Sequence, residues 1–155
     1  MDLTQLITQD NSDNGVWTPV VIYGKQQDFD LLILGDDADV VQKHERKAMK
    51  KMKKVMGDVM KNKDIDFDDD TLDEAADNAI ESVLVRIAGI RGWKIERKGT
   101  KEISRESEPV ILCGEELKDD ITSYKNLITR IPAIREFVLK VSRDRTNFLS
   151  KPSGN

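Results

Sequence analysis

Two short runs near the N-terminus limit what this chain can fold into more than any other feature. Residues 16–24 (VWTPVVIYG) and 29–35 (FDLLILG) are rich in β-branched and other apolar side chains, and the KQQD between them has the length of a hairpin connection. Because an isolated β-hairpin is only marginally stable in water, helices or a partner chain must cover one of its faces. Pro19 cannot donate a backbone hydrogen bond, so the first strand is expected at a sheet edge or beginning after Pro19.

Two long amphipathic patterns supply helices for that cover. Apolar residues recur at helical spacing from residue 40 to about residue 60, just after Asp36 and Asp37, which are residue types that cap helices. Residues 72–87 show the clearest amphipathic stripe, and Gly89 or Gly92 is suited to the end of that helix. We therefore expect two consecutive helices joined by the acidic connector at residues 62–70.

The C-terminal third adds shorter elements. Residues 92–117 look irregular, with short strand candidates at 93–95 and 110–113, and Thr122 or Ser123 caps a short helix after them. Pro132 opens a last helix, and Phe148 and Leu149 are expected to fold back as a clasp that closes the domain. We predict an α+β fold in which an N-terminal β-hairpin packs with three to four α-helices and helix predominates. The apolar stripe of the last helix consists of Ile134, Phe137, Val138 and Val141.

The chain length suits a single domain with short appendages. Residues 1–15 are polar and turn-rich and are expected to be a flexible N-terminal arm, residues 16–149 a single α+β domain, and residues 150–155 a disordered tail. No apolar run approaches the roughly 20 residues that span a bilayer. The acidic N-terminus also lacks the basic start and apolar centre of a signal peptide. We therefore expect a soluble protein that is not exported and has no membrane partner.

Metal binding is not expected. The alternating aspartates of DIDFDDDTLDE, beginning at Asp64, resemble a calcium loop, but Asp69 stands where that loop requires glycine and Ala75 where it requires glutamate. His44 is the only histidine and Cys113 the only cysteine, so no zinc ligand set can be assembled. The acidic stretch is therefore interpreted as a solvated loop.

Enzymatic function is not expected either. The sequence contains no glycine-rich phosphate loop and no serine in a nucleophile elbow, and we predict neither a cofactor nor catalytic residues. Cys113 is interpreted as a small buried residue in a strand, and Trp17 and Trp93 as core anchors. A net charge of −4 argues against a nucleic-acid partner.

One compositionally biased segment, residues 43–63, carries most of the methionine and much of the lysine. Its methionines either pack onto the following helix while the lysines face water, or form a surface for a partner, since methionine adapts to changing contacts. The segment lacks Trp and Phe, the bulky anchors of calmodulin targets and membrane-surface helices. The candidate partner-binding residues are Met49, Met52, Met56 and Met60, flanked by Lys50 and Lys53.

The end of the chain carries a resemblance. PAIREFVLKVSRDRTNFL, residues 132–149, resembles the C-terminal signature of a family of small tailed-phage and prophage proteins described as tail assembly chaperones. RGWKIERKG, CGEEL and DLLILGDDADVVQKHERK are similar to further segments of that family, in the same order, and together these matches span most of residues 16–149. The chain departs from the pattern at Ala133, where an aromatic is usual, and at Ser123, where asparagine is commoner.

The resemblance implies a non-enzymatic protein of the host cytoplasm that assists phage tail assembly. Its partner would be the tape-measure protein, with tail-tube subunits as a further client. The alternative is a structural virion component, such as a neck, tail-completion or minor tail protein. A regulatory protein with a calmodulin-like or nucleic-acid partner is a third interpretation, and the sequence sets no oligomeric state.

Overall fold

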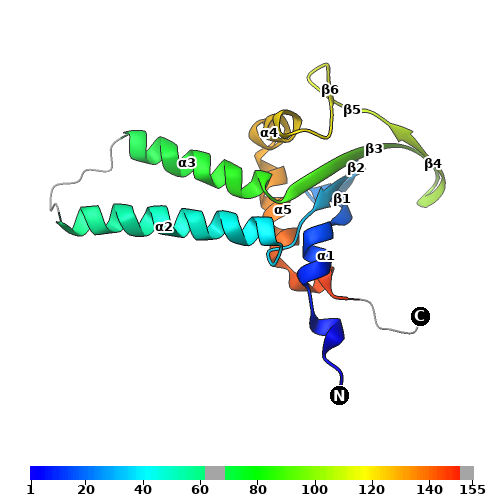
Figure 1. The fold of residues 1–155 in the computed structure, drawn as a ribbon. Coiled ribbons are helices and arrows are strands. Elements are labelled where there is room, and N and C mark those ends of the chain that lie inside the picture. Colours follow the sequence, from blue (N-terminus) through cyan, green and yellow to red (C-terminus); the bar gives the residue numbers. More distant parts are fainter. Residues whose placement is uncertain (62–68, 151–155) are drawn as a thin grey trace.

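The chain folds into an antiparallel sheet with helices, and the computed structural model describes residues 1–61 and 69–150. The 3₁₀ turn η1 (Thr4–Leu6) and helix α1 (Gln9–Asn14) precede strands β1 (Val16–Ile22) and β2 (Lys25–Ile33). Helices α2 (Asp39–Lys61) and α3 (Asp69–Leu84) follow, and then strands β3 (Ile87–Lys98) and β4 (Lys101–Glu108). The small pair β5 (Val110–Leu112) and β6 (Glu115–Leu117), helices α4 (Ile121–Arg130) and α5 (Pro132–Arg143), and the turn η2 (Arg145–Phe148) complete the order. The predicted α+β class, with an N-terminal β-hairpin, is confirmed (Figure 1).

Four antiparallel strands form the main sheet, in the spatial order β1-β2-β3-β4. β1 is an edge strand, as the proline within it predicted, and the register shifts between Pro19 and Val21. Leu31 and Ile33 of β2 are fully buried, whereas the alternate residues point to the opposite face. The sheet therefore has one face for the core and another that the core does not use.

Helices α4 and α5 cover the core face. Leu127 and Ile128 of α4 and Ile134 and Val138 of α5 are buried in one cluster with Leu31 and the other apolar residues of the sheet. Each such side chain contributes roughly 1.5–3 kcal/mol when it is fully covered. Pro132 occupies the first turn of α5 as predicted. The N-cap of α4 differs from the prediction: it is Asp120, whose Oδ1 accepts a 2.7 Å hydrogen bond from the Ser123 backbone N–H.

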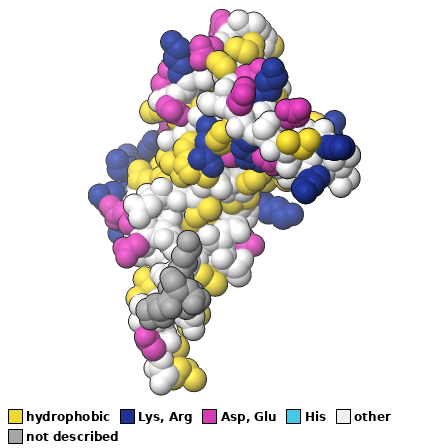
Figure 2. Space-filling model, turned by 90° about the vertical axis from the view of Figure 1, so that its right-hand side faces the viewer, with side chains coloured by type: hydrophobic (Ala, Val, Ile, Leu, Met, Phe, Trp, Pro, Cys, Tyr) yellow, Lys and Arg dark blue, Asp and Glu magenta, His cyan; other side chains and the backbone are white. Residues whose placement is uncertain are grey.

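The opposite face carries a row of stacked tryptophan and arginine side chains. The guanidinium of Arg91 lies 4.2 Å from the ring centroid of Trp17 and 5.2 Å from that of Trp93, and the guanidinium of Arg105 lies 5.0 Å from the ring centroid of Trp93. The nearly buried carboxylate of Asp30 accepts 2.9 Å hydrogen bonds from Arg91 Nε and Trp93 Nε1. The prediction that both tryptophans are core anchors is therefore wrong: they stack on cations at the outer face. Figure 2 shows the side of the molecule that lies at the right in Figure 1, and there hydrophobic side chains lie interspersed with charged ones.

The long β3–β4 hairpin is the largest departure from the sequence prediction, which treated residues 92–117 as irregular. β3 has 12 residues and β4 has 8, and every residue of β4 is exposed. The sequence of β4, KEISRESE, therefore has no buried face and lacks the alternation of apolar and polar residues that identifies a strand.

Residues 9–14 form helix α1, whereas a flexible arm was expected from residue 1 to 15. Asn11 Nδ2 donates to the carbonyl oxygens of Phe148 (3.2 Å) and Leu149 (2.9 Å), and Asp13 Oδ1 accepts from the Asp39 backbone N–H (2.7 Å).

Phe148 is buried and so closes the domain as predicted, but Leu149 is exposed. Of the expected disordered tail, residues 151–155 lie outside the described residues. So do residues 62–68 of the acidic connector.

Across residues 1–61 and 69–150, no helix combines the length and the apolar character needed to cross a membrane.

Gly92 and Gly57 provide a matched test of packing. An ideal Cβ on Gly92 would lie 2.3 Å from the backbone carbonyl oxygen of Glu108, whereas one on Gly57, inside α2, would meet no atom within 4 Å. We expect Gly92→Ala to lower the free energy of unfolding by roughly 1–3 kcal/mol, as overpacking does. Gly57→Ala should stabilise by up to about 1 kcal/mol, because alanine is the better helix former. Denaturation followed by circular dichroism measures both changes, and equal effects would contradict the β3–β4 contact.

A second prediction concerns Asp37, which joins both ends of the chain. Its carboxylate accepts hydrogen bonds from Arg145 Nε (2.9 Å) and Nη2 (3.0 Å) and from the Thr8 hydroxyl. The bonds from Arg145, and then the one from Thr8, hold the pKa of Asp37 below its ordinary value. The pKa of Asp37 is lower in the folded state than in the unfolded state, so the ionised carboxylate stabilises the fold at neutral pH. This stabilisation is lost as the pH falls through about 4 toward the folded-state pKa.

We therefore expect Asp37→Asn to lower the free energy of unfolding by about 1 kcal/mol at pH 7. The difference from the unsubstituted protein should shrink toward zero in acid. Urea denaturation between neutral and acidic pH measures it. Glu106→Gln, at an exposed position of β4, serves as a control that should show a smaller difference at pH 7. A difference that stays constant with pH would show that the Asp37 charge contributes nothing.

Candidate partner-binding site

Helices α2 and α3, together called the helical hairpin here, extend away from the rest of the molecule (Figure 1). The 23 residues of α2 correspond to about 35 Å and the 16 residues of α3 to about 24 Å, at 1.5 Å per residue. Only the N-terminal end of α2 and the C-terminal end of α3 reach the buried core, where Val41 and Val83 lie. Most of the helical hairpin therefore lies outside the domain's own core.

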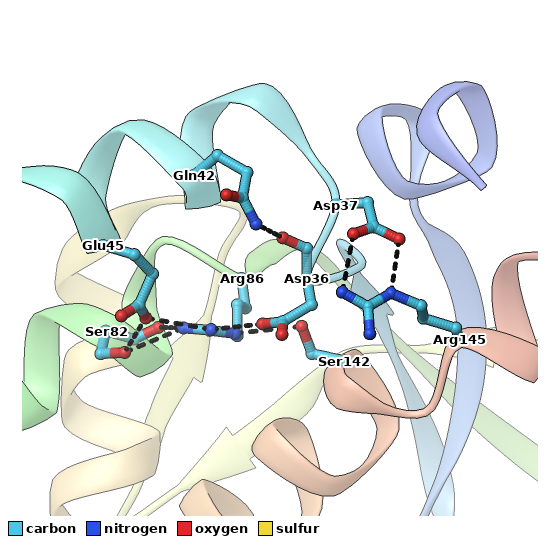
Figure 3. A network of polar contacts seen from close by, with 8 residues as sticks. All are labelled: Asp36, Asp37, Gln42, Glu45, Ser82, Arg86, Ser142 and Arg145. Atoms are coloured by element: carbon cyan, nitrogen blue, oxygen red, sulfur yellow. Dashed lines mark hydrogen bonds and ion pairs between the residues drawn. The ribbon is translucent and has the colours of Figure 1, made fainter. Parts of the chain in front are cut away.

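A buried arginine fixes the base of the helical hairpin. Arg86, which follows α3, is 1% exposed, and Figure 3 shows its guanidinium at the meeting point of α2, α3, α5 and the segment after β2. Nε donates to Ser142 Oγ (3.0 Å), Nη1 to the backbone oxygen and the hydroxyl of Ser82, and Nη2 to Asp36 Oδ1 (2.7 Å) and Glu45 Oε1 (3.1 Å). All five N–H groups of the guanidinium thus have an acceptor. The network holds both helices at one fixed position on the body.

The apolar stripe of α3 continues beyond the part that the core covers. Val83 is buried and Ile80, one turn outward, is half-buried; Ala76 and Leu72 follow on the same helical face and are exposed, Leu72 by 57%. The stripe of α2 behaves in the same way, from buried Val41 outward. A helix face that is buried at one end and uncovered at the other indicates a surface available to another chain.

Between the two helices lies a groove of about 400 Å³. Its floor is apolar, with α2 contributing Met52, Val55 and Met56, and α3 contributing Ala75. A second hollow of about 280 Å³ continues it toward the base, sharing Ala48, Lys51 and Asn78 with it. We call the first of these the hairpin groove; its lining residues are Ala48, Lys51, Met52, Val55, Met56, Glu74, Ala75 and Asn78.

The structure places the predicted partner-binding residues on the exposed surface of α2. The four methionine side chains are 55–83% exposed: Met49, Met52, Met56 and Met60. The interpretation that these methionines pack onto the next helix is therefore wrong, because most of the surface of each side chain is exposed. Met52 and Met56 line the hairpin groove, whereas Met49 and Met60 lie outside its lining. Lys50 lines the adjoining hollow and Lys53 lines neither.

Sequence reasoning left out several groove residues. Val55 and Ala48 belong to the apolar pattern of α2 and could have been included from their spacing to Met52. Glu74 and Asn78 could not, because a polar residue facing a groove has the same sequence signal as one facing water. The contribution of α3 thus becomes visible only when the two helices are placed side by side.

Cys113 is exposed, so the prediction that it is buried in a strand is wrong. It occupies the turn between β5 and β6 with φ at 51°, and Arg130 Nη1 lies 3.5 Å from its sulfur. Within residues 1–61 and 69–150, no three His, Cys, Asp or Glu side chains are grouped so that they could hold a metal ion.

A scan of protein-family models found no match for this chain, and searches of curated proteins and of solved structures found none either. Function is therefore inferred from the geometry of the helical hairpin together with the sequence resemblance.

Removal of the buried guanidinium tests the anchor of the helical hairpin. Arg86→Ala leaves Asp36 and Glu45 without their cation. Their side chains are 27% and 45% exposed and can be hydrated, so we expect a cost of about 3 kcal/mol, the lower end of the range for breaking a buried pair. Arg86→Lys keeps the charge but has only three donors, so we expect an intermediate loss. Arg97→Ala, which breaks an exposed pair with Asp28, is the control and should cost at most about 1 kcal/mol. Urea denaturation measures all three, and an equal cost for Arg86→Ala and Arg97→Ala would show that the network is not an anchor.

Proposed function

We propose that this protein is a non-enzymatic tail assembly chaperone of a tailed phage, acting in the host cytoplasm and binding the tape-measure protein, with tail-tube subunits as a further client. The observation that supports this is the uncovered apolar surface of the helical hairpin, presented on a base that the Arg86 network fixes. The resemblance of residues 132–149 and of the upstream segments to tail assembly chaperones supplies the biological setting.

The physical mechanism is that of a holdase. A tape-measure chain is long and helical, and its amphipathic helices expose apolar stripes that aggregate unless something covers them. An amphipathic helix laid along the hairpin groove covers Met52, Val55 and Met56 together with its own stripe. Each large side chain that becomes fully covered contributes roughly 1.5–3 kcal/mol. Methionine, with its unbranched and flexible side chain, accommodates helices of different sequence.

Reversibility follows from the size of the site. The exposed apolar surface is divided among a few side chains on two helices, and this favours an interaction that tail-tube subunits can displace as they polymerise on the tape measure. The abundant lysines of α2 keep the unoccupied helical hairpin in solution.

Co-expression with the tape-measure protein of the same phage tests the proposal. We expect the unsubstituted chain to raise the soluble fraction of the tape-measure protein and to be recovered with it. The double variant Met52→Asp/Met56→Asp should abolish both effects, because carboxylates in the groove oppose apolar contact. Ile111→Asp is the matched control: its side chain is 59% exposed on β5, away from the helical hairpin, and the change should leave both effects intact.

Particles purified from the phage that encodes this chain test the virion-component alternative. A chaperone is absent from purified particles, whereas a neck, tail-completion or minor tail protein persists in them at fixed stoichiometry. Mass spectrometry of particles measures this. A tape-measure protein that is equally soluble without this chain would contradict the chaperone function.

A further inference from the structure

The two helices of the helical hairpin carry opposite charge. α2 contains eight Lys and Arg against three Asp and Glu, while α3 contains six Asp and Glu and neither Lys nor Arg. Helices of opposite charge attract each other, and this attraction assists their pairing. The same division of charge also leaves a long groove with a basic wall and an acidic wall.

The rims of the groove show this polarity directly. Along the hairpin groove and the adjoining hollow, α2 contributes Lys47, Lys50 and Lys51, and α3 contributes Glu74 and Glu81. All five side chains are exposed. Within the described residues, none of the five forms an ion pair, so their charges are available to a ligand.

The dimensions of the groove suit one α-helix. The hairpin groove and the adjoining hollow together run along α2 from His44 to Met56, a rise of about 18 Å, which corresponds to roughly three helical turns. The floor between the rims is apolar and is formed by side chains of two neighbouring helices, and a third helix packs its ridges into such a surface. An amphipathic helix can bury its stripe there and place one polar flank against each rim.

We propose that the groove binds a partner's amphipathic helix whose two flanks carry opposite charge, the acidic flank against α2 and the basic flank against α3, and that this fixes the direction in which the helix lies. A helix with a given arrangement of flanks matches both rims in one direction only, because reversing it exchanges the flanks. In the reversed direction like charges face each other on both sides, and such contacts act against binding. The inference rests on the proposed function and specifies which client segments the helical hairpin selects and how they lie on it.

Three synthetic peptides of identical composition and three to four helical turns test the proposal. All share a Leu/Ala stripe; the first carries Glu on one flank and Lys on the other, the second has the two flanks exchanged, and the third mixes both charges on each flank. Exposed ion pairs each change an equilibrium constant by roughly twofold to fivefold. We therefore expect the two polarised peptides to bind about tenfold more tightly than the mixed peptide at low salt, and this advantage should disappear at high salt.

The direction of binding is read from the methionine methyl signals of α2. With a nitroxide at the peptide N-terminus, one polarised peptide should broaden the Met49 signal more strongly and the other the Met60 signal, since Met49 is nearer to the His44 end of the lining and Met60 lies beyond its Met56 end. The variant Lys47→Glu/Lys50→Glu/Lys51→Glu/Glu74→Lys/Glu81→Lys exchanges the charges of the two rims, and it should reverse the direction of both peptides. Circular dichroism of that variant confirms that the helices are retained.

Three outcomes overturn the inference. If the mixed peptide binds as tightly as the polarised peptides and in both directions, the rim charges select neither the peptide nor its direction. The proposed chaperone function is unaffected by that outcome. If Met52→Asp/Met56→Asp binds every peptide as well as the unsubstituted chain, the groove is not the site. If the chain sediments as a dimer whose methionine signals do not respond to any peptide, a second copy occupies the groove instead. Failure of the proposed function is recognised separately, by a tape-measure protein whose solubility this chain does not change.

Discussion

The buried guanidinium of Arg86 is the interaction on which the arrangement of the helices depends. Taking an arginine out of water costs several kcal/mol unless every donor finds an acceptor. Here the acceptors are Asp36 in the segment after β2, Glu45 in α2, Ser82 in α3 and Ser142 in α5 (Figure 3). If any of these segments moves, at least one charged donor loses its partner inside the protein. The position of α2, the end of α3 and the C-terminal part of α5 are therefore determined together.

This anchor separates the molecule into two parts with different physical character. The body has a closed core, in which the sheet face bearing Leu31 is covered by α4 and α5. The helical hairpin leaves that core after about one turn of each helix and holds its remaining apolar side chains in water. Most of the stability of a helix in a protein comes from tertiary packing and little from helix propensity alone. The body thus supplies the stability that allows the helical hairpin to remain uncovered until a partner arrives.

Periodic elements could be predicted from the sequence, and contacts that depend on tertiary position could not. The edge position of β1 followed from Pro19 and the start of α5 from Pro132, because each proline restricts the backbone locally. The strand β4 escaped prediction because both of its faces are solvated, so its sequence carries no period. Arg86 gave no signal either, since an arginine between a helix and a strand is usually exposed. The methionines of α2 were candidates from the sequence alone, whereas their exposure and the contribution of α3 to the groove became visible only in the structure.

The row of stacked rings on the outer face of the sheet has a spectroscopic consequence. Trp17 and Trp93 are the only tryptophans of the chain, and both contact the guanidinium of Arg91. Indole emission therefore originates entirely from the β-sheet, whereas more than half of the residues in the described α-helices belong to α2 and α3 and contribute to the far-ultraviolet signal. Tryptophan fluorescence thus reports on the sheet, and far-ultraviolet circular dichroism reports mainly on the helices. A melting curve recorded in both channels shows directly whether the helices fray before the sheet comes apart.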